Sequence, residues 1–134
     1  MQSRRRPRQR SSMPTKRGGP AWPGRRFRNA AEVRAAWWYR LRGYRVVDTN
    51  VWVAGNELDV VARRGRELVF CEVKSKSGAG YGDPVEMVSA EKMRRLRRAA
   101  EAWLARHPEC ARCDVRFDVV AVRRRRLEHI RAAF

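Results

Sequence analysis

The chain has 134 residues and carries 32 Lys and Arg against 14 Asp and Glu, a formal net charge of +18. This charge favours nucleic acid or an acidic surface as partner, although solubilising arginine or a coding bias toward Arg would give the same balance. No segment approaches the roughly 18–20 apolar residues of a membrane span, and no apolar run follows the basic start as in a signal peptide. We therefore expect a cytoplasmic protein with no membrane partner.

The basic residues are concentrated at the start of the chain. Residues 1–28 hold ten of them and no acidic residue, and the remainder has 22 basic and 14 acidic residues, a net charge of +8. Residues 1–24 combine Arg, Ser, Pro and Gly with almost no apolar side chains, a composition typical of disorder. The sequence predicts a disordered basic arm over residues 1–24 and a single domain over residues 25–134, which is long enough for one core.

The first predicted element of the domain is a helix over residues 29–42, with Gly43 suited to its end. Its expected buried stripe consists of apolar side chains at helical spacing: Ala31, Ala35, Trp38, Tyr39 and Leu41. Glu32 shares this side of the helix near its start, where the helix dipole favours a carboxylate. The functional alternative for Glu32 is an acidic group beside a metal site.

Three strands are predicted next. The first opens at residues 43–47 and resumes or bends around residues 50–53. Residues 58–62 and 68–73 supply two further runs of β-branched and apolar side chains. A two-residue turn that begins at Gly65 joins these runs as a hairpin, because glycine adopts the positive φ that such a turn needs.

This hairpin determines which side chains face each other. With the turn at Gly65, counting outward along both strands brings Asp59 opposite Glu72. Alternation then places Glu57, Asp59, Glu72 and Lys74 on one face of the sheet. Opposed Cβ atoms lie roughly 4.5–5.5 Å apart, and two carboxylates that close repel each other unless a cation lies between them. The alternative to a cation site is that these are charged residues at strand ends that face solvent.

A glycine-rich loop over residues 78–82 precedes a long helix, which starts at Asp83 or after Ser89 and ends at His107. The loop allows close approach of a nucleic-acid strand or is a mobile connection. The helix has a stripe of mostly apolar residues: Val88, Lys92, Leu96, Ala99, Ala100 and Trp103. We expect the Lys92 stem to pack while its amine reaches toward the acidic residues.

The same helix carries the predicted nucleic-acid-binding residues. They are its basic side chains, which could lie along a phosphate backbone: Lys92, Arg94, Arg95 and Arg98. A solvated helix face is an equally good explanation of the three arginines.

The last part of the chain predicts two strands. Residues 115–122 alternate so that Phe117 points to one face and Asp118 to the other, and a basic turn at residues 123–126 leads to an edge strand at residues 127–130. The order of elements is α-β-β-β-α-β-β, which predicts an α/β domain with a mixed central sheet flanked by helices.

Two of the cysteines are candidate metal ligands. His107, Cys110 and Cys113 form a His-x-x-Cys-x-x-Cys sequence that offers three zinc ligands. A fourth ligand is missing nearby, since His129 is the only other histidine. The alternative is that both cysteines are loop thiols, and three cysteines do not imply a disulfide framework.

Taken together, these residues resemble the YraN-like family of the PD-(D/E)XK nuclease superfamily, which is similar in fold to archaeal Holliday junction resolvases. The likeness runs from about Gly24 to the C-terminus. Its carriers are Glu32, Gly43, Tyr44, residues 55–59, residues 71–74, Gly82, Pro84, Val88, Lys92, residues 116–120 and residues 132–134. The chain departs from the family at Asn56 and Ala31, where glycine is usual, and no Pro precedes Asp59. None of these departures removes a ligand.

The resemblance implies a restriction-endonuclease-like fold with four catalytic residues. Asp59 and Glu72 would bind Mg²⁺ or Mn²⁺ together with the main-chain carbonyl of Val73, Lys74 would be the catalytic lysine, and Glu32 an auxiliary acid. Such a metal lowers the pKa of a bound water and stabilises charge on phosphoryl oxygens.

The implied activity is metal-dependent endonucleolytic hydrolysis of phosphodiester bonds in DNA, including branched or junction DNA. DNA is favoured over RNA, and the resolvase likeness implies a homodimer if branched DNA is the substrate. The alternatives are a nucleic-acid-binding protein that does not cleave and a small basic scaffold or ribosome-associated protein.

Overall fold

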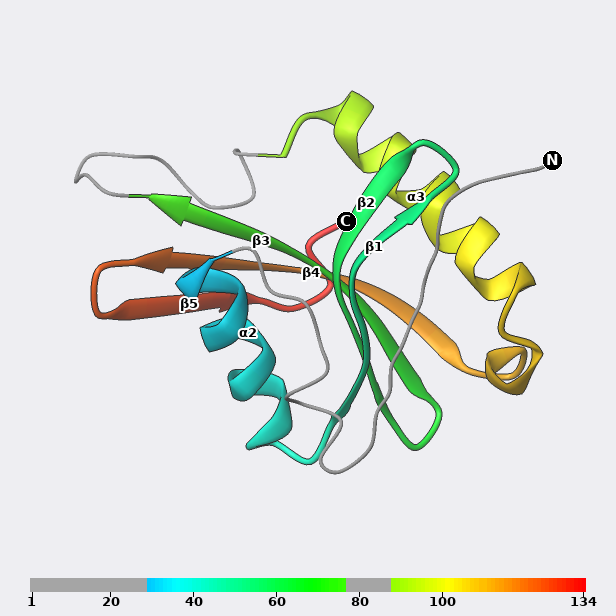
Figure 1. Ribbon diagram of the computed structural model, residues 1–134, viewed down its shortest axis with the longest axis horizontal. Coiled ribbons are helices and arrows are strands. Elements are labelled where there is room, and N and C mark those ends of the chain that lie inside the picture. Colours follow the sequence, from blue (N-terminus) through cyan, green and yellow to red (C-terminus); the bar gives the residue numbers. More distant parts are fainter. Residues whose placement is uncertain (1–28, 77–87) are drawn as a thin grey trace, which may run out of the picture.

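The computed structural model describes residues 29–76 and 88–134. Its elements follow one another in the order α2 (Ala30–Arg40), β1 (Arg45–Val53), β2 (Asn56–Arg64), β3 (Glu67–Lys76), α3 (Ala90–Ala105), the 3-10 helix η2 (Pro108–Cys110), β4 (Asp114–Arg123) and β5 (Arg126–Ile130) (Figure 1). The predicted order of helices and strands is confirmed. The predicted basic arm, the glycine-rich loop and the helix start at Asp83 lie outside the described residues.

The strands form one mixed sheet in the order β1-β2-β3-β4-β5. Only β3 and β4 pair in parallel, and the other three neighbouring pairs are antiparallel. Parallel neighbours need a crossover connection, and α3 lies within the connection from β3 to β4. The predicted mixed central sheet is therefore confirmed.

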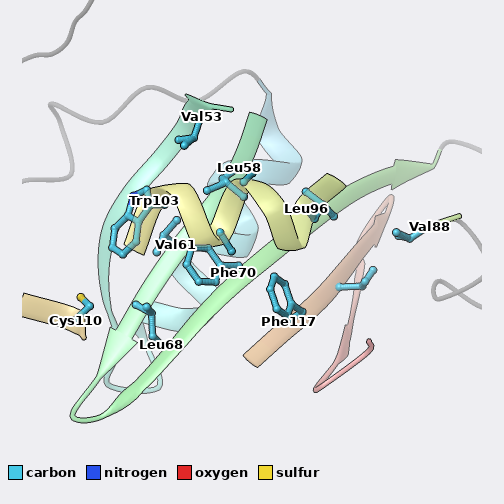
Figure 2. Packing of buried hydrophobic residues seen from close by; sticks show 13 residues of the cluster. Val53, Leu58, Val61, Leu68, Phe70, Val88, Leu96, Trp103, Cys110 and Phe117 are labelled. Atoms are coloured by element: carbon cyan, nitrogen blue, oxygen red, sulfur yellow. The ribbon is translucent and has the colours of Figure 1, made fainter. Parts of the chain in front are cut away.

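Helices cover both faces of this sheet, α2 on one side and α3 on the other (Figure 1). On the α3 side, Trp103 and Leu96 pack on strand residues that include Leu58, Phe70 and Phe117 (Figure 2). On the α2 side the buried cluster joins helix and strand residues: Ala31, Ala35, Ala36, Tyr39, Tyr44, Val46, Val60, Ala62, Val69, Cys71, Val120 and Val122. Burial of apolar surface against both faces is the main stabilising contribution.

Side-chain caps define where the helices begin. Asn29 accepts a hydrogen bond from the backbone N–H of Glu32 at 3.0 Å, and Ser89 accepts one from Lys92 at 3.1 Å. The helix start after Ser89 is thus the observed one. Leu41 is 76% exposed, so its predicted place in the buried stripe is wrong. It lies two residues, or about 200°, around the helix from buried Tyr39.

The hairpin of β2 and β3 has the predicted register. The paired residues run from Arg64 opposite Glu67 to Val60 opposite Cys71, and Gly65 in the turn has φ +59°. Within the described ranges, no helix combines the length and apolar character needed to cross a membrane.

Candidate active site

The candidate site lies where β2 and β3 part. Their ladder ends at the pair Val60 and Cys71, beyond which the two strands diverge (Figure 1). Asp59 and Glu72 are the next residues on either side. The Asp59 carboxylate accepts a hydrogen bond from the backbone N–H of Val73 at 2.9 Å, in place of a strand partner. A carboxylate is thereby fixed at the opening between the strands.

The prediction that four charged residues share one face of the sheet is wrong in part. Leu58 and Val61 both pack in the α3-side cluster, although strict alternation would send residues three apart to opposite faces. The alternation of side chains in β2 is therefore interrupted between Leu58 and Val61. Since Leu58 faces α3, its neighbour Glu57 points to the α2 side. Glu72 points instead toward α3. Asp59 lies where the alternation of β2 is interrupted, between the side chains of Glu57 and Glu72.

Glu72 is a buried carboxylate with two lysines beside it. Its side chain is 5% exposed, and its Oε2 lies 3.4 Å from Nζ of Lys74 and 3.7 Å from Nζ of Lys92. The Lys92 amine thus reaches from α3 toward the acidic residues, as expected from its position on the apolar stripe. Lys74 follows Glu72 by two residues and lies on the same side of β3.

Glu32 reaches the site from the first turn of α2. It is buried, and its Oε1 accepts a hydrogen bond from the Asn50 side chain at 3.0 Å. Asn50 has φ 47° in β1, a backbone conformation that asparagine tolerates better than most residues. The fold therefore brings together the four predicted catalytic residues: Glu32, Asp59, Glu72 and Lys74.

The environment of Asp59 strongly opposes its ionisation. Burial and the charge of Glu72, with smaller contributions from Glu32 and Glu57, together raise the pKa of Asp59 to about 8. The N–H of Val73 acts in the opposite direction, but it does not outweigh them. Carboxylates gathered in this way repel each other until a cation lies between them.

The oxygen atoms at this point suit a hard divalent cation. Asp59 and Glu72 offer carboxylates, which Mg²⁺ and Mn²⁺ prefer as ligands. The Val73 N–H points to Asp59, and the carbonyl of a strand residue faces the same edge as its N–H, so the Val73 oxygen is directed there too. In the described part of the chain no three His, Cys, Asp or Glu side chains form a ligand group, so main-chain oxygen and water would complete the shell.

The predicted nucleic-acid-binding residues do not form one surface. Lys92 points to Glu72, whereas Arg94 lies about 200° further around α3 and is exposed. Arg98 is exposed one turn after Arg94, and Arg95 is paired at 3.9 Å with Glu91. The helix thus separates one lysine at the site from arginines on its outer side.

The candidate zinc ligands His107 and Cys110 have other contacts in the fold. The His107 ring stacks on Trp103 with centroids 3.7 Å apart, and its Nδ1 lies 3.0 Å from a carboxylate oxygen of Glu109. The Cys110 thiol is buried beside the guanidinium of Arg63 at 3.5 Å. Because no ligand group of three such side chains exists in residues 29–76 and 88–134, the zinc hypothesis is not supported by the fold.

Asp118 is the buried charge whose importance the sequence did not show. It is fully buried and accepts hydrogen bonds from Tyr39 at 2.7 Å, His129 at 2.7 Å, the Arg116 guanidinium at 2.9 Å and the N–H of Ala132 at 3.0 Å. Burial alone would raise its pKa, but these donors together hold the pKa of Asp118 well below its usual range. The sequence offered one signal for this role: Asp118 lies inside an apolar strand, and burying a carboxylate is costly unless it has hydrogen-bond or charge partners.

Comparison with known proteins places these residues in a family. Residues 31–122 match the model described as "Uncharacterised protein family UPF0102". The UPF0102 protein YraN of Escherichia coli is 39% identical over 121 residues, covering 90% of this chain and 86% of the relative. A UPF0102 protein of Frankia alni is 47% identical over 97 residues, covering 69% and 80%, and one of Geobacter sulfurreducens is 44% identical over 108 residues, covering 77% and 83%. The YraN-like resemblance is confirmed: the chain belongs to the family UPF0102.

Proposed function

We propose that this protein is a metal-dependent endonuclease that hydrolyses phosphodiester bonds in DNA. One observation carries the proposal. Asp59 and Glu72 meet where β2 and β3 part, and Lys74 and Lys92 contact Glu72 from β3 and α3. Two carboxylates and two ammonium groups at one strand opening match the needs of phosphodiester hydrolysis, in which charge develops on phosphoryl oxygens.

The acidic residues would hold Mg²⁺ or Mn²⁺, with Asp59 and Glu72 as side-chain ligands and the Val73 carbonyl as the main-chain ligand. A bound divalent cation supplies positive charge to the phosphoryl oxygens and lowers the pKa of a coordinated water. Glu32, which is held by Asn50, keeps a third carboxylate near Asp59. The raised pKa of Asp59 is the expected condition of a cation site before its charge is neutralised.

The lysines would act directly on the phosphate. Lys74 has a side chain 29% exposed, so its ammonium can leave Glu72 and donate to an oxygen that gains charge as the phosphorus–oxygen bond breaks. Hydrolysis joins the water oxygen to phosphorus and releases the ester oxygen, which takes up a proton. Lys92, which contacts the same Glu72 oxygen from α3, would hold a second phosphoryl oxygen.

We also propose a superfamily, a substrate and an oligomeric state for this nuclease. The arrangement of Asp59, Glu72 and Lys74 fits the PD-(D/E)XK superfamily, and we infer from the resolvase likeness that branched DNA is the substrate and that two copies act together. The net charge of +18 supports a polyanionic partner.

The test is cleavage of labelled branched, flapped and single-stranded DNA with Mg²⁺, Mn²⁺ or chelator. We expect cation-dependent cutting by the wild type and its loss in Asp59→Asn, which keeps the side-chain shape and removes the charge. Glu101→Gln is the matched control, because Glu101 is exposed on α3. Equal cutting by wild type and Asp59→Asn would reveal a contaminating nuclease and refute the site.

A nucleic-acid-binding protein without catalysis is the second candidate. The observation that favours it is the pair of lysines on Glu72, which neutralise that carboxylate without a cation. This candidate predicts salt-sensitive DNA binding, no cleavage, and no Mn²⁺-dependent change in melting temperature. An Mn²⁺-dependent rise that disappears in Asp59→Asn would exclude it.

A further inference from the structure

An exposed tryptophan stands beside the acidic residues. Trp52, near the end of β1, is 66% exposed, and its cross-strand partner in β2 is Glu57. Glu57 in turn contributes to the raised pKa of Asp59. A large apolar ring is therefore presented to solvent within a few residues of the candidate site.

The backbone directs this ring away from the core. Val51 and Val53 both pack in the α3-side cluster, so the residue between them points to the α2 side of the sheet. That side also holds the first turn of α2, where Glu32 is bonded to Asn50 of the same strand β1. Trp52 thus lies beside Glu57 and on the same side as Glu32, at the β1–β2 hairpin, while Glu72 faces α3 across the strand opening.

A basic turn flanks them on the other side. The parallel register places Lys74 opposite Ala121, so β3 and β4 end together and the β4–β5 turn follows directly. Arg124 and Arg125 in this turn are exposed, and the Arg34 guanidinium binds both of their backbone carbonyls. Figure 1 shows this turn and the β1–β2 hairpin on opposite sides of the point where β2 and β3 part.

We propose that Trp52 is a stacking platform for an unpaired base next to the cleaved phosphate, and that the turn at Arg124 and Arg125 holds the backbone on the other side. The inference rests on the proposed function and specifies its substrate: DNA with unpaired nucleotides at the site. A base inside a duplex has both faces covered by its neighbours, so only an unpaired base offers a face to the indole. Stacking is tolerant of sequence because every base has a π-face.

The test measures binding in chelator, so that it does not depend on cleavage. The probes are a blunt DNA duplex and the same duplex with a short single-stranded extension. We expect Trp52→Ala to weaken binding of the extended duplex by about 5- to 150-fold, since stacking of one base contributes roughly 1–3 kcal/mol. Binding of the blunt duplex should be unchanged. Trp52→Phe, which keeps a ring, should recover most of the affinity.

The matched control is Trp37→Ala, which removes a second exposed tryptophan, 46% exposed, from α2. It should leave the binding of both probes unchanged. An equal loss for both probes in Trp52→Ala, no loss for either, or the same loss in Trp37→Ala would each refute the stacking role.

Failure of the proposed function has a different signature. If the wild type does not cleave DNA but Trp52→Ala loses the preference for the extended duplex, the stacking role is supported and the nuclease activity is refuted. If cleavage depends on Asp59 but Trp52→Ala binds both probes like the wild type, the nuclease activity is supported and the stacking role is refuted.

Discussion

Removing the charge of Asp59 should stabilise the metal-free protein. The folded environment raises the pKa of this carboxyl from 3.8 to about 8, through burial and the repulsion of Glu72. Between those two pH values the folded state binds a proton that the unfolded chain has released, so stability falls as pH rises. An asparagine side chain does not ionise and carries no such dependence, so the free energy of unfolding of Asp59→Asn should exceed that of the wild type.

The size of the effect follows from the same values. At about 1.4 kcal/mol per pH unit, the interval from 3.8 to pH 7 corresponds to roughly 4 kcal/mol. Asp59 is only partly buried, and water relieves some of the repulsion. We therefore expect Asp59→Asn to be more stable by about 1–3 kcal/mol at pH 7, and by less at pH 5.

Urea denaturation in chelator at pH 5, 7 and 8.5 measures this difference. Glu101→Gln serves as the control, because it removes an exposed carboxylate on α3 and should change little. Mn²⁺ in place of chelator should remove most or all of the advantage of Asp59→Asn, since a cation bound only to the folded wild type stabilises it by about 2.7 kcal/mol at 100 times the dissociation constant. An advantage of Asp59→Asn that fails to grow with pH, or a loss of stability at every pH, would refute the electrostatic reasoning.

Three further predictions concern the buried Asp118, its donor Tyr39 and the cysteines that follow α3. Asp118→Asn should destabilise the protein by about 2–5 kcal/mol in urea denaturation, because it leaves the Arg116 guanidinium and the other donors without the buried carboxylate that they share. Tyr39→Phe removes one of those donors and should cost about 1–2 kcal/mol by the same measurement. Metal analysis of the purified protein should find no stoichiometric zinc, and Cys110→Ser should not change the metal content; zinc that is lost in this variant would restore the ligand hypothesis.

Local rules predicted much of the fold. The hairpin register followed from one glycine turn between two β-forming runs, and counting outward from that turn holds as far as the pair Val60 and Cys71, next to Asp59 and Glu72. The cap at Ser89 and the stripe ending at Trp103 were equally local, because capping and helical spacing depend on neighbours in the sequence. These features needed no information about distant parts of the chain.

Other features depend on contacts that no local pattern contains. The four donors to Asp118 include Tyr39 from α2 and His129 from β5, 79 and 11 residues away in sequence. The change of phase between Leu58 and Val61 follows from packing on α3, and it overrode simple alternation. His107, a candidate zinc ligand in the sequence, stacks on Trp103, a contact made possible by the turn after α3.

Two aspartates in the same sheet have opposite electrostatic environments. Asp118 is fully buried, yet its donors lower its pKa, so its negative charge is held by the protein itself. Asp59 is more accessible, yet its partial burial and the nearby carboxylates, Glu72 above all, raise its pKa. A side chain kept for stability would not be placed among like charges, which destabilise the fold at neutral pH. The raised pKa of Asp59 therefore supports the proposed cation site, because perturbed carboxyls cluster at functional sites.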